Sequence, residues 1–171
     1  MVEKIETLVT YLEMVKHPAG NILLPVVENC EIKRLQNPTV EIYRFLYDKV
    51  GSKINWNDRK ILSNEDLKKI IEDPNLEIFV AYIENAPAGY IELDFNNPKE
   101  SKIAYFGVFP EFYGKKIGAN LLGWGIKYCW GKNPEKIWLH TCDLDHPNAL
   151  PLYIKAGFVP YKKEIQFVAK L

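Results

Sequence analysis

A turn rich in glycine and lysine is the first stretch whose residue types suggest a chemical role. Residues 113–119 read YGKKIGA, after an apolar run at 103–109 and before a segment at 117–128 in which apolar residues recur every three or four positions. The apolar run predicts a buried strand, and the second pattern predicts a helix. A turn from a strand into a helix presents unpaired backbone N–H groups and the positive end of the helix dipole. The turn therefore predicts a phosphate site.

This composition is not specific, because an ordinary helix start with solvated lysines has the same residues. Two phosphate-binding motifs are excluded by the sequence. The pattern G-x-G-x-x-G of dinucleotide-binding domains is absent, and Gly114 and Gly118 do not lead into the Gly-Lys-Ser/Thr of a P-loop. The choice between a phosphate site and a plain helix start therefore depends on the second half of the chain.

A second stretch shifts that choice. Residues 136–142 (KIWLHTC) predict another apolar strand, and residues 143–158 (DLDHPNALPLYIKAGF) follow it. Here the chain resembles the GCN5-related N-acetyltransferase (GNAT) superfamily, whose acetyl-CoA loop Q/R-x-x-G-x-G/A precedes a strand and a helix ending in L-Y-x-K-x-G-F. The segment 152–158 (LYIKAGF) carries that ending without a mismatch, and 140–153 is similar to a bacterial branch with the pattern HTCxLDHPxALxLY. The resemblance covers roughly residues 76–168.

The resemblance implies acetyl-CoA as cosubstrate, bound without a metal. It places the following residues at the cofactor: Phe106, Gly107, Val108, Tyr113, Gly114, Lys115, Lys116, Ile117, Gly118, Ala119, Cys142 and Asn148. Two positions depart from the family loop, because Tyr113 stands where Gln or Arg is preferred and Lys116 stands where the first glycine is preferred. We expect Lys116 to take helical backbone angles and to point outward, since pyrophosphate needs backbone N–H groups and close approach.

Acetyl transfer from a thioester to an amine needs a neutral amine, two reactants held together, and a proton for the departing thiolate. The family motif implies that Tyr153 supplies that proton, and the alternative is a core tyrosine packed under Gly157 and Phe158. Glu92 is the predicted base, because strand alternation places it on one face with Tyr90. The alternative for Glu92 is a solvated strand face.

The remaining polar candidates have plainer interpretations. His140 lies in an apolar strand, where a lone histidine is more often a core residue than a base, and His146 is expected to help cap the helix that Pro147 starts. Cys142 has no evident activating neighbour for a nucleophilic role. No spacing of His, Cys, Asp and Glu resembles a zinc site.

The substrate is predicted to contact Trp56 and Tyr105. Trp56 lies in a polar loop, 55–59 (NWNDR), whose Trp, Asp and Arg could recognise an amine or a carboxylate by stacking and ion pairing. The alternative is that Trp56 anchors the loop in the core, and we expect Asp58 and Arg59 to face solvent.

Composition agrees with one domain over residues 1–171. The chain has 171 residues, of which 47% are hydrophobic, and this is enough for a substantial core. The 22 basic residues equal the 22 acidic ones, so no net charge attracts nucleic acid or an anionic membrane. Three cysteines without C-x-x-C spacing or a secretory leader indicate reduced thiols in a cytoplasmic protein.

The element pattern predicts an α+β (α/β three-layer) fold, with a mixed, mostly antiparallel central sheet flanked by helices. Residues 5–14 fit either a helix or a strand, 18–25 a loop, and 31–35 a second candidate for the first strand. Helices are predicted after 37–39 and from 63–66, and strands at 76–83 and 88–95 are joined by a turn at 84–87. The unit 103–142 should be parallel and right-handed, and the final strand is predicted at 164–169.

The sequence therefore predicts an acetyl-CoA-dependent N-acetyltransferase that acts by direct ternary-complex transfer on a small-molecule or protein amine. One alternative is a non-catalytic acyl-CoA-binding or sensor module, favoured by the departures at Tyr113 and Lys116. The other is a nucleotide- or polyphosphate-binding α/β protein, which would leave the Tyr153 motif unexplained. The expected partners are the amine acceptor and, as an option, a second copy in a homodimer, with no nucleic acid and no membrane.

Overall fold

The computed structural model describes residues 3–17 and 25–170, and this part of the chain forms a seven-stranded sheet in the order β2-β3-β4-β5-β6-β1-β7. The strands are β1 (Lys4–Met14), β2 (Cys30–Arg34), β3 (Leu76–Ile83), β4 (Ala86–Asp94), β5 (Glu100–Val108), β6 (Lys136–Cys142) and β7 (Val159–Ala169). The helices are α1 (Val40–Gly51), α2 (Asn64–Ile71), α3 (Ile117–Trp130) and α4 (Ala149–Lys155), with a 3-10 turn at Pro110–Phe112.

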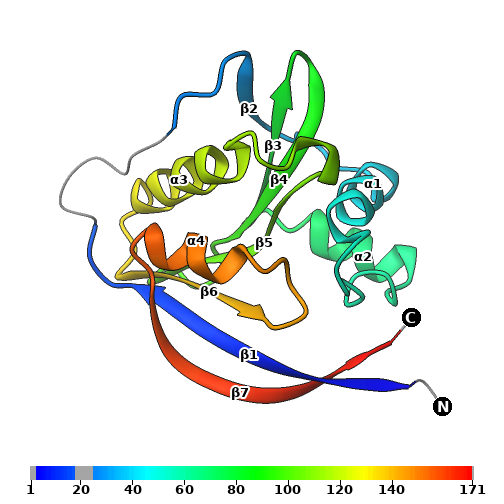
Figure 1. Cartoon of the computed structure of the whole chain (residues 1–171). Coiled ribbons are helices and arrows are strands. Elements are labelled where there is room, and N and C mark those ends of the chain that lie inside the picture. Colours follow the sequence, from blue (N-terminus) through cyan, green and yellow to red (C-terminus); the bar gives the residue numbers. More distant parts are fainter. Residues whose placement is uncertain (1–2, 18–24, 171) are drawn as a thin grey trace.

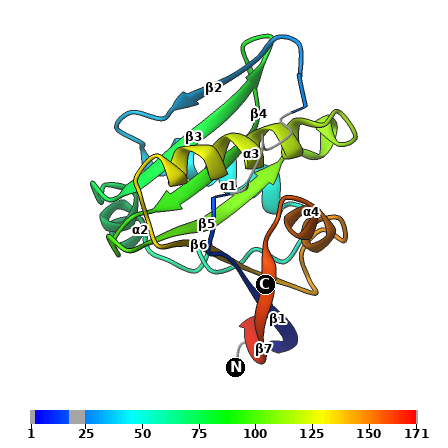
Figure 2. The ribbon, with the colours of Figure 1, turned by 90° about the vertical axis from the view of Figure 1, so that its left-hand side faces the viewer.

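Helices cover both faces of the sheet, which gives three layers (Figures 1 and 2). Helices α3 and α4 pack on one face, where Leu121, Leu122 and Tyr153 join the larger core cluster. Helices α1 and α2 pack on the other, where Tyr43 and Leu67 belong to a second cluster. Every strand pair is antiparallel except β5 and β6, which are parallel. The predicted mixed, mostly antiparallel fold is confirmed.

Short-range sequence signals set the ends of several elements. The Thr39 hydroxyl accepts a hydrogen bond from the N–H of Ile42 at the start of α1, and the Ser63 hydroxyl accepts one from Asp66 at the start of α2. The turn between β3 and β4 is shorter than predicted, because Ile83 already pairs with Ala86. The two turn residues, 84 and 85, both have positive φ angles, as a two-residue hairpin with right-handed twist requires.

The chain ends differ most from the sequence predictions. Residues 4–14 form a strand, which pairs with β6 on one side and β7 on the other. Residues 30–34 form the opposite edge strand and not the first strand of the fold. Strand β7 begins at Val159, five positions before the predicted start, because its pairing with β1 continues across a bulge at Tyr11/Leu12. Most of the predicted loop, residues 18–24, lies outside the described residues.

The parallel strands β5 and β6 pair only at their beginnings. Their register comprises 100 with 136, 101 with 137 and 102 with 138. Beyond Lys102 and Trp138 the two strands continue to Val108 and Cys142 without pairing to each other, so a gap opens in the middle of the sheet. This gap positions the site.

Candidate active site

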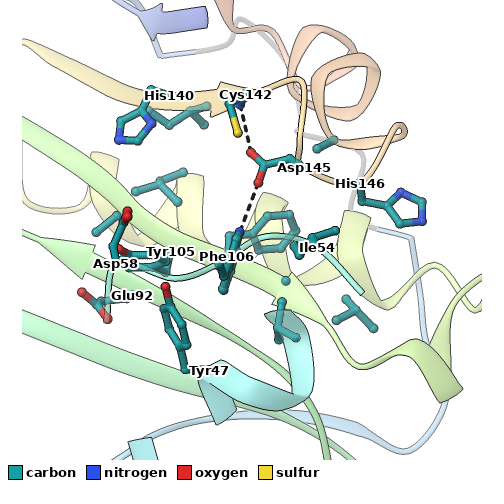
Figure 3. Close-up of a pocket in the computed structure, with 18 of the residues that line it drawn as sticks. Tyr47, Ile54, Asp58, Glu92, Tyr105, Phe106, His140, Cys142, Asp145 and His146 are labelled. Atoms are coloured by element: carbon teal, nitrogen blue, oxygen red, sulfur yellow. Dashed lines mark hydrogen bonds between the residues drawn. The ribbon is translucent and has the colours of Figure 1, made fainter. Parts of the chain in front are cut away.

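A cavity of about 850 Å³ lies at this gap, and its walls come from both faces of the sheet (Figure 3). It brings together the following predicted site residues: Trp56, Glu92, Tyr105, Phe106, Gly107, Val108, Tyr113, Gly114, Lys116, Ile117, Gly118, Ala119, Cys142, Asn148 and Tyr153. Lys115 is not part of the lining, because its ammonium lies over the Phe112 ring, 5.2 Å from the centroid.

The start of α3 forms one end of the cavity. The first hydrogen bond within the helix runs from the N–H of Asn120 to the carbonyl of Lys116 at 3.1 Å, so three N–H groups at 117–119 precede it. No side chain among the described residues caps this end. A Cβ at Gly118 would lie 3.5 Å from Cγ2 of Val108. Because these N–H groups have no cap and precede the first helical hydrogen bond, they can bind an anion.

Lys116 does not have the backbone conformation that we expected. Its φ of 61° and ψ of 7° are left-handed and not helical. This region costs an ordinary residue about 1–2 kcal/mol and costs glycine almost nothing. The structure thus gives a physical reason for the glycine that the family loop prefers at this position.

The turn before α4 closes over the same end. The Tyr113 ring meets the His146 ring edge to face at 4.9 Å between centroids. Nδ1 of His146 accepts a hydrogen bond from the N–H of Asn148 at 3.1 Å, but α4 begins at Ala149 and has no side-chain cap, so the expected capping role of His146 is wrong. Tyr113 therefore contacts the turn between β6 and α4.

Tyr153 projects from α4 into the core at the edge of the cavity. Its side chain is 7% exposed, and its ring centroid lies 6.1 Å from that of Phe106 and 6.3 Å from that of Phe158. Burial raises the pKa of Tyr153, and the charge of Asp145 raises it further. The hydroxyl therefore keeps its proton at neutral pH and can donate it to a hydrogen bond.

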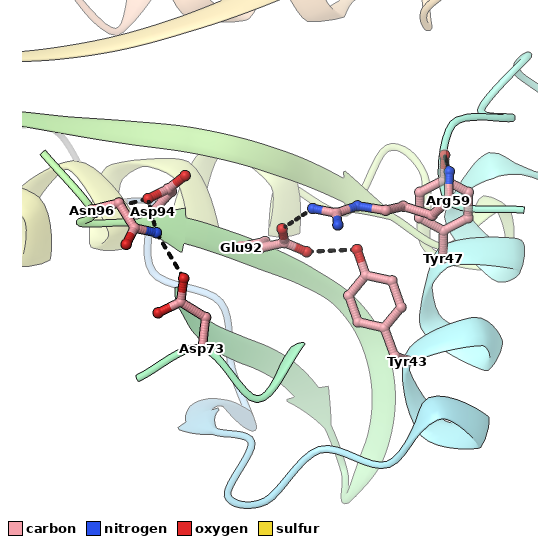
Figure 4. A network of polar contacts seen from close by, with 7 residues as sticks. All are labelled: Tyr43, Tyr47, Arg59, Asp73, Glu92, Asp94 and Asn96. Carbon is pink, nitrogen blue, oxygen red and sulfur yellow. Dashed lines mark hydrogen bonds and ion pairs between the residues drawn. The ribbon is translucent and has the colours of Figure 1, made fainter. Parts of the chain in front are cut away.

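Glu92 is held in a buried polar network (Figure 4). It is fully buried, with Oε1 2.8 Å from Nη2 of Arg59 and Oε2 accepting a hydrogen bond from the Tyr43 hydroxyl at 2.6 Å. Burial raises the pKa of Glu92, while Arg59 and Tyr43 act in the opposite direction. The solvated strand face considered for Glu92 is wrong. The prediction that Arg59 faces solvent is also wrong, because only 14% of its side chain is exposed.

The loop between α1 and α2 is tied to β6 through Trp56. The indole Nε1 donates to Oδ1 of Asp145 at 3.1 Å, while Oδ2 of Asp145 accepts from the Thr141 hydroxyl and the Cys142 N–H. The half-buried indole also packs 5.2 Å from the Tyr105 ring. The sequence analysis missed Asp145, although an aspartate three residues after a strand is a common turn-forming signal.

His140 is exposed and lines the cavity, so the expectation of a core histidine is wrong. Its neighbours Leu139 and Thr141 are buried, and strand alternation turns His140 to the opposite side. Although the side chain is open to solvent, the surrounding cavity walls desolvate it, and this desolvation and the nearby charge of Lys102 lower the pKa of His140, so the neutral imidazole is favoured at pH 7. Alternation within 137–142 was the signal that could have located it.

Several lining residues come from parts of the sequence that suggested no function. Thr7 and Val9 reach the cavity from β1, and Gln166 and Val168 reach it from β7. In addition, the Asn57 side-chain amide donates to the carbonyl of Ala169 at 2.8 Å. The β1–β7 ribbon therefore forms a wall of the site.

Among residues 3–17 and 25–170, no group of three or more His, Cys, Asp or Glu side chains could hold a metal ion. Cys30, Cys129 and Cys142 are free thiols. Within the same ranges, no helix has the length and hydropathy needed to cross a membrane.

A known protein family matches the part of the chain that contains most of the cavity lining. Residues 39–158 match the model of the Acetyltransferase (GNAT) family. No curated protein matches the chain significantly.

Solved structures share the fold at low sequence identity. A functionally unknown conserved protein from Staphylococcus epidermidis is 17% identical with a TM-score of 0.68, over 96% of this chain and 62% of that one. A tandem GNAT protein from the clavulanic acid biosynthesis pathway is 15% identical with a TM-score of 0.64, over 98% and 54%. An aminoglycoside acetyltransferase from an uncultured soil metagenomic sample is 20% identical with a TM-score of 0.65, over 84% and 97%. The chain thus spans less than two thirds of the first two proteins.

Proposed function

The chain belongs to the acetyltransferase (GNAT) family, and we propose that it transfers the acetyl group of acetyl-CoA to a primary amine in a direct ternary complex. The observation that carries this proposal is the cavity at the β5–β6 gap, which reaches from the start of α3 to the aromatic loop around Trp56. A cavity of this shape can hold two reactants in contact, and such positioning removes much of the entropic barrier to transfer.

In this proposal, the pyrophosphate of CoA binds at the N–H groups of residues 117–119. The helix dipole and the missing side chain at Gly118 favour an anion there. The pantetheine arm then runs along the backbone that β5 leaves unpaired beyond Lys102, because its amides can replace the absent strand partner. The thioester comes to lie beside Phe106 and Tyr153, which both line the cavity.

Tyr153 then protonates the sulfur. The amine nitrogen attacks the thioester carbonyl, the carbon–sulfur bond breaks, and the thiolate takes the proton of the Tyr153 hydroxyl. The excess N–H proton of the adduct restores that hydroxyl, so the step is balanced. A tyrosine whose pKa is raised remains protonated until the thiolate forms, and this supports the acid role.

The acceptor side is formed by Trp56, Tyr105 and the exposed carboxylate of Asp58. Aromatic faces and a carboxylate are suited to an ammonium group, so we propose a cationic amine as the acceptor class. Glu92 supports this wall indirectly. Because both of its oxygens are engaged, we assign it the role of holding Arg59, whose guanidinium carbon lies 5.1 Å from the Tyr105 ring centroid.

Release of free thiol from acetyl-CoA in the presence of an amine panel tests this function. The panel holds a polyamine, an aminoglycoside, a lysine peptide and a peptide with a free N-terminus. Thiol release that depends on the amine supports transfer. Tight binding of acetyl-CoA without turnover on any amine would support the non-catalytic module, which the strained Lys116 backbone also favours.

A pair of variants at Gly118 tests the cofactor site. Gly118→Val places methyl groups against Val108 and Phe106, so CoA affinity measured by calorimetry should fall at least tenfold, or about 1.4 kcal/mol. Gly118→Ala is the matched control, since its Cβ meets neighbours only at ordinary contact distance. Equal CoA affinity in both folded variants would remove this turn from the site.

A further inference from the structure

His140 lines the cavity at the gap between β5 and β6, and it has no role in the transfer steps described above. His140 lies on β6, two residues beyond the last pair with β5, and its backbone is paired only on the other side, with Tyr11 of β1. The exposed imidazole therefore stands at the mouth of the gap, in the wall of the cavity (Figure 3).

His140 and Tyr153 lie on opposite faces of the sheet. Tyr153 belongs to the core between the sheet and α3 and α4, together with Leu139. His140 follows Leu139 and so projects to the side of α1 and α2, where Glu92 and Tyr105 form the acceptor wall. A thioester in the gap would have the proton donor on one side and the imidazole on the other, which is the side from which the amine arrives.

Two carboxylates that line the cavity, Glu92 and Asp94, already accept hydrogen bonds. Both oxygens of Glu92 are already bound, by Arg59 and Tyr43. Asp94 accepts hydrogen bonds from the backbone and side-chain amide of Asn96. A neutral imidazole, in contrast, has one nitrogen that accepts a proton near neutral pH.

We propose that His140 accepts the proton that the ammonium group of the acceptor must lose before its nitrogen attacks the thioester. This inference rests on the proposed function. The proton moves from the ammonium nitrogen to a ring nitrogen, the free amine forms the C–N bond, and the imidazolium later releases the proton to water. Together with the proton that Tyr153 supplies to sulfur, the step yields the amide, free CoA and one released proton.

The charges around His140 fit this role. The groups that face it from the surrounding elements are Tyr11 of β1, Lys102 of β5, Trp138 of β6, Asp58 of the α1–α2 loop, Asp145 of the β6–α4 loop and Glu164 of β7. Burial and Lys102 lower the pKa of His140, while the three carboxylates partly oppose this. The imidazole is therefore neutral before the reaction, and the carboxylates attract the ammonium group of the acceptor.

The test compares His140→Gln with His17→Gln, a control outside the cavity lining. We expect kcat of His140→Gln to fall roughly 100-fold at pH 7, with acetyl-CoA affinity and melting temperature unchanged. The defect should shrink at least tenfold by pH 9.5, because the amine then loses its proton to solvent. A rate loss that is constant with pH, or no loss, would overturn the proposal.

A second readout does not need an acceptor. The chain has three histidines, so NMR titration of the free protein assigns His140 by the signal missing from His140→Gln. We expect that signal to titrate below pH 6.5, and a pKa at or above 6.5 would contradict the role. Absence of transfer to every amine would instead count against the proposed function, while this titration still decides the state of His140.

Discussion

Removing Arg59 should expose how strongly the acceptor wall depends on one buried ion pair. Arg59→Met keeps an unbranched apolar stem but removes the guanidinium, so the carboxylate of Glu92 stays buried without its cation. Breaking a buried pair in this way typically costs about 3–5 kcal/mol. For a chain of this size, 1 kcal/mol corresponds to about 2–4 °C, so the melting temperature should fall by about 6–20 °C at pH 8.

The loss should depend on pH with a definite sign. Burial raises the pKa of Glu92, and without Arg59 the largest opposing effect is gone. An acid whose folded-state pKa is raised destabilises the fold as pH rises above its unfolded value, so Arg59→Met should lose less stability at pH 5 than at pH 8.

Thermal unfolding of two variants measures this effect. Lys60→Met, in the neighbouring exposed pair with Asp48, is the matched control and should change stability by less than about 1 kcal/mol. If Arg59→Met and Lys60→Met melt alike at both pH values, the buried pair does not support the wall and the reasoning is wrong.

Two further changes test the packing around the cavity. In chemical denaturation, the free energy of unfolding of Lys116→Gly should exceed that of Lys116→Ala by about 1 kcal/mol, because only glycine adopts the left-handed backbone without strain. A higher stability of Lys116→Ala would show that the turn is not strained. Gly107→Ala should lose about 1–3 kcal/mol of stability, because the new Cβ would overlap with Cγ1 of Val50 on α1. Adding Val50→Ala to the same chain should restore most of this stability. A double variant as unstable as Gly107→Ala would contradict the close packing of α1 on β5.

The features that were predicted best from the sequence are those that depend on a short stretch of residues. The helix starts after 37–39 and at 63–66, the strand at 136–142 and the parallel arrangement of β5 and β6 follow from local patterns, and all are present. The start of β7 was missed because it depends on pairing with β1, more than 140 residues away in the chain.

The parts of the site that were missed depend on contacts between distant residues. Arg59 and Glu92 lie 33 positions apart, and Trp56 and Asp145 lie 89 apart, so no local pattern links them. His140 looked like a core residue because its strand is apolar. His140 is exposed because β5 and β6 are no longer paired at this position, and this separation arises only when the whole sheet has assembled.

The most direct test of the account is Tyr153→Phe, assayed for turnover, acetyl-CoA affinity and melting temperature on the same preparation. The change keeps the ring that packs against Phe106 and removes only the hydroxyl. If that hydroxyl helps the thiolate to leave, kcat should fall roughly 10- to 1000-fold with acetyl-CoA affinity little changed, because the interaction exists mainly in the transition state. A stable variant with wild-type turnover would contradict the acid role and leave Tyr153 as a core tyrosine.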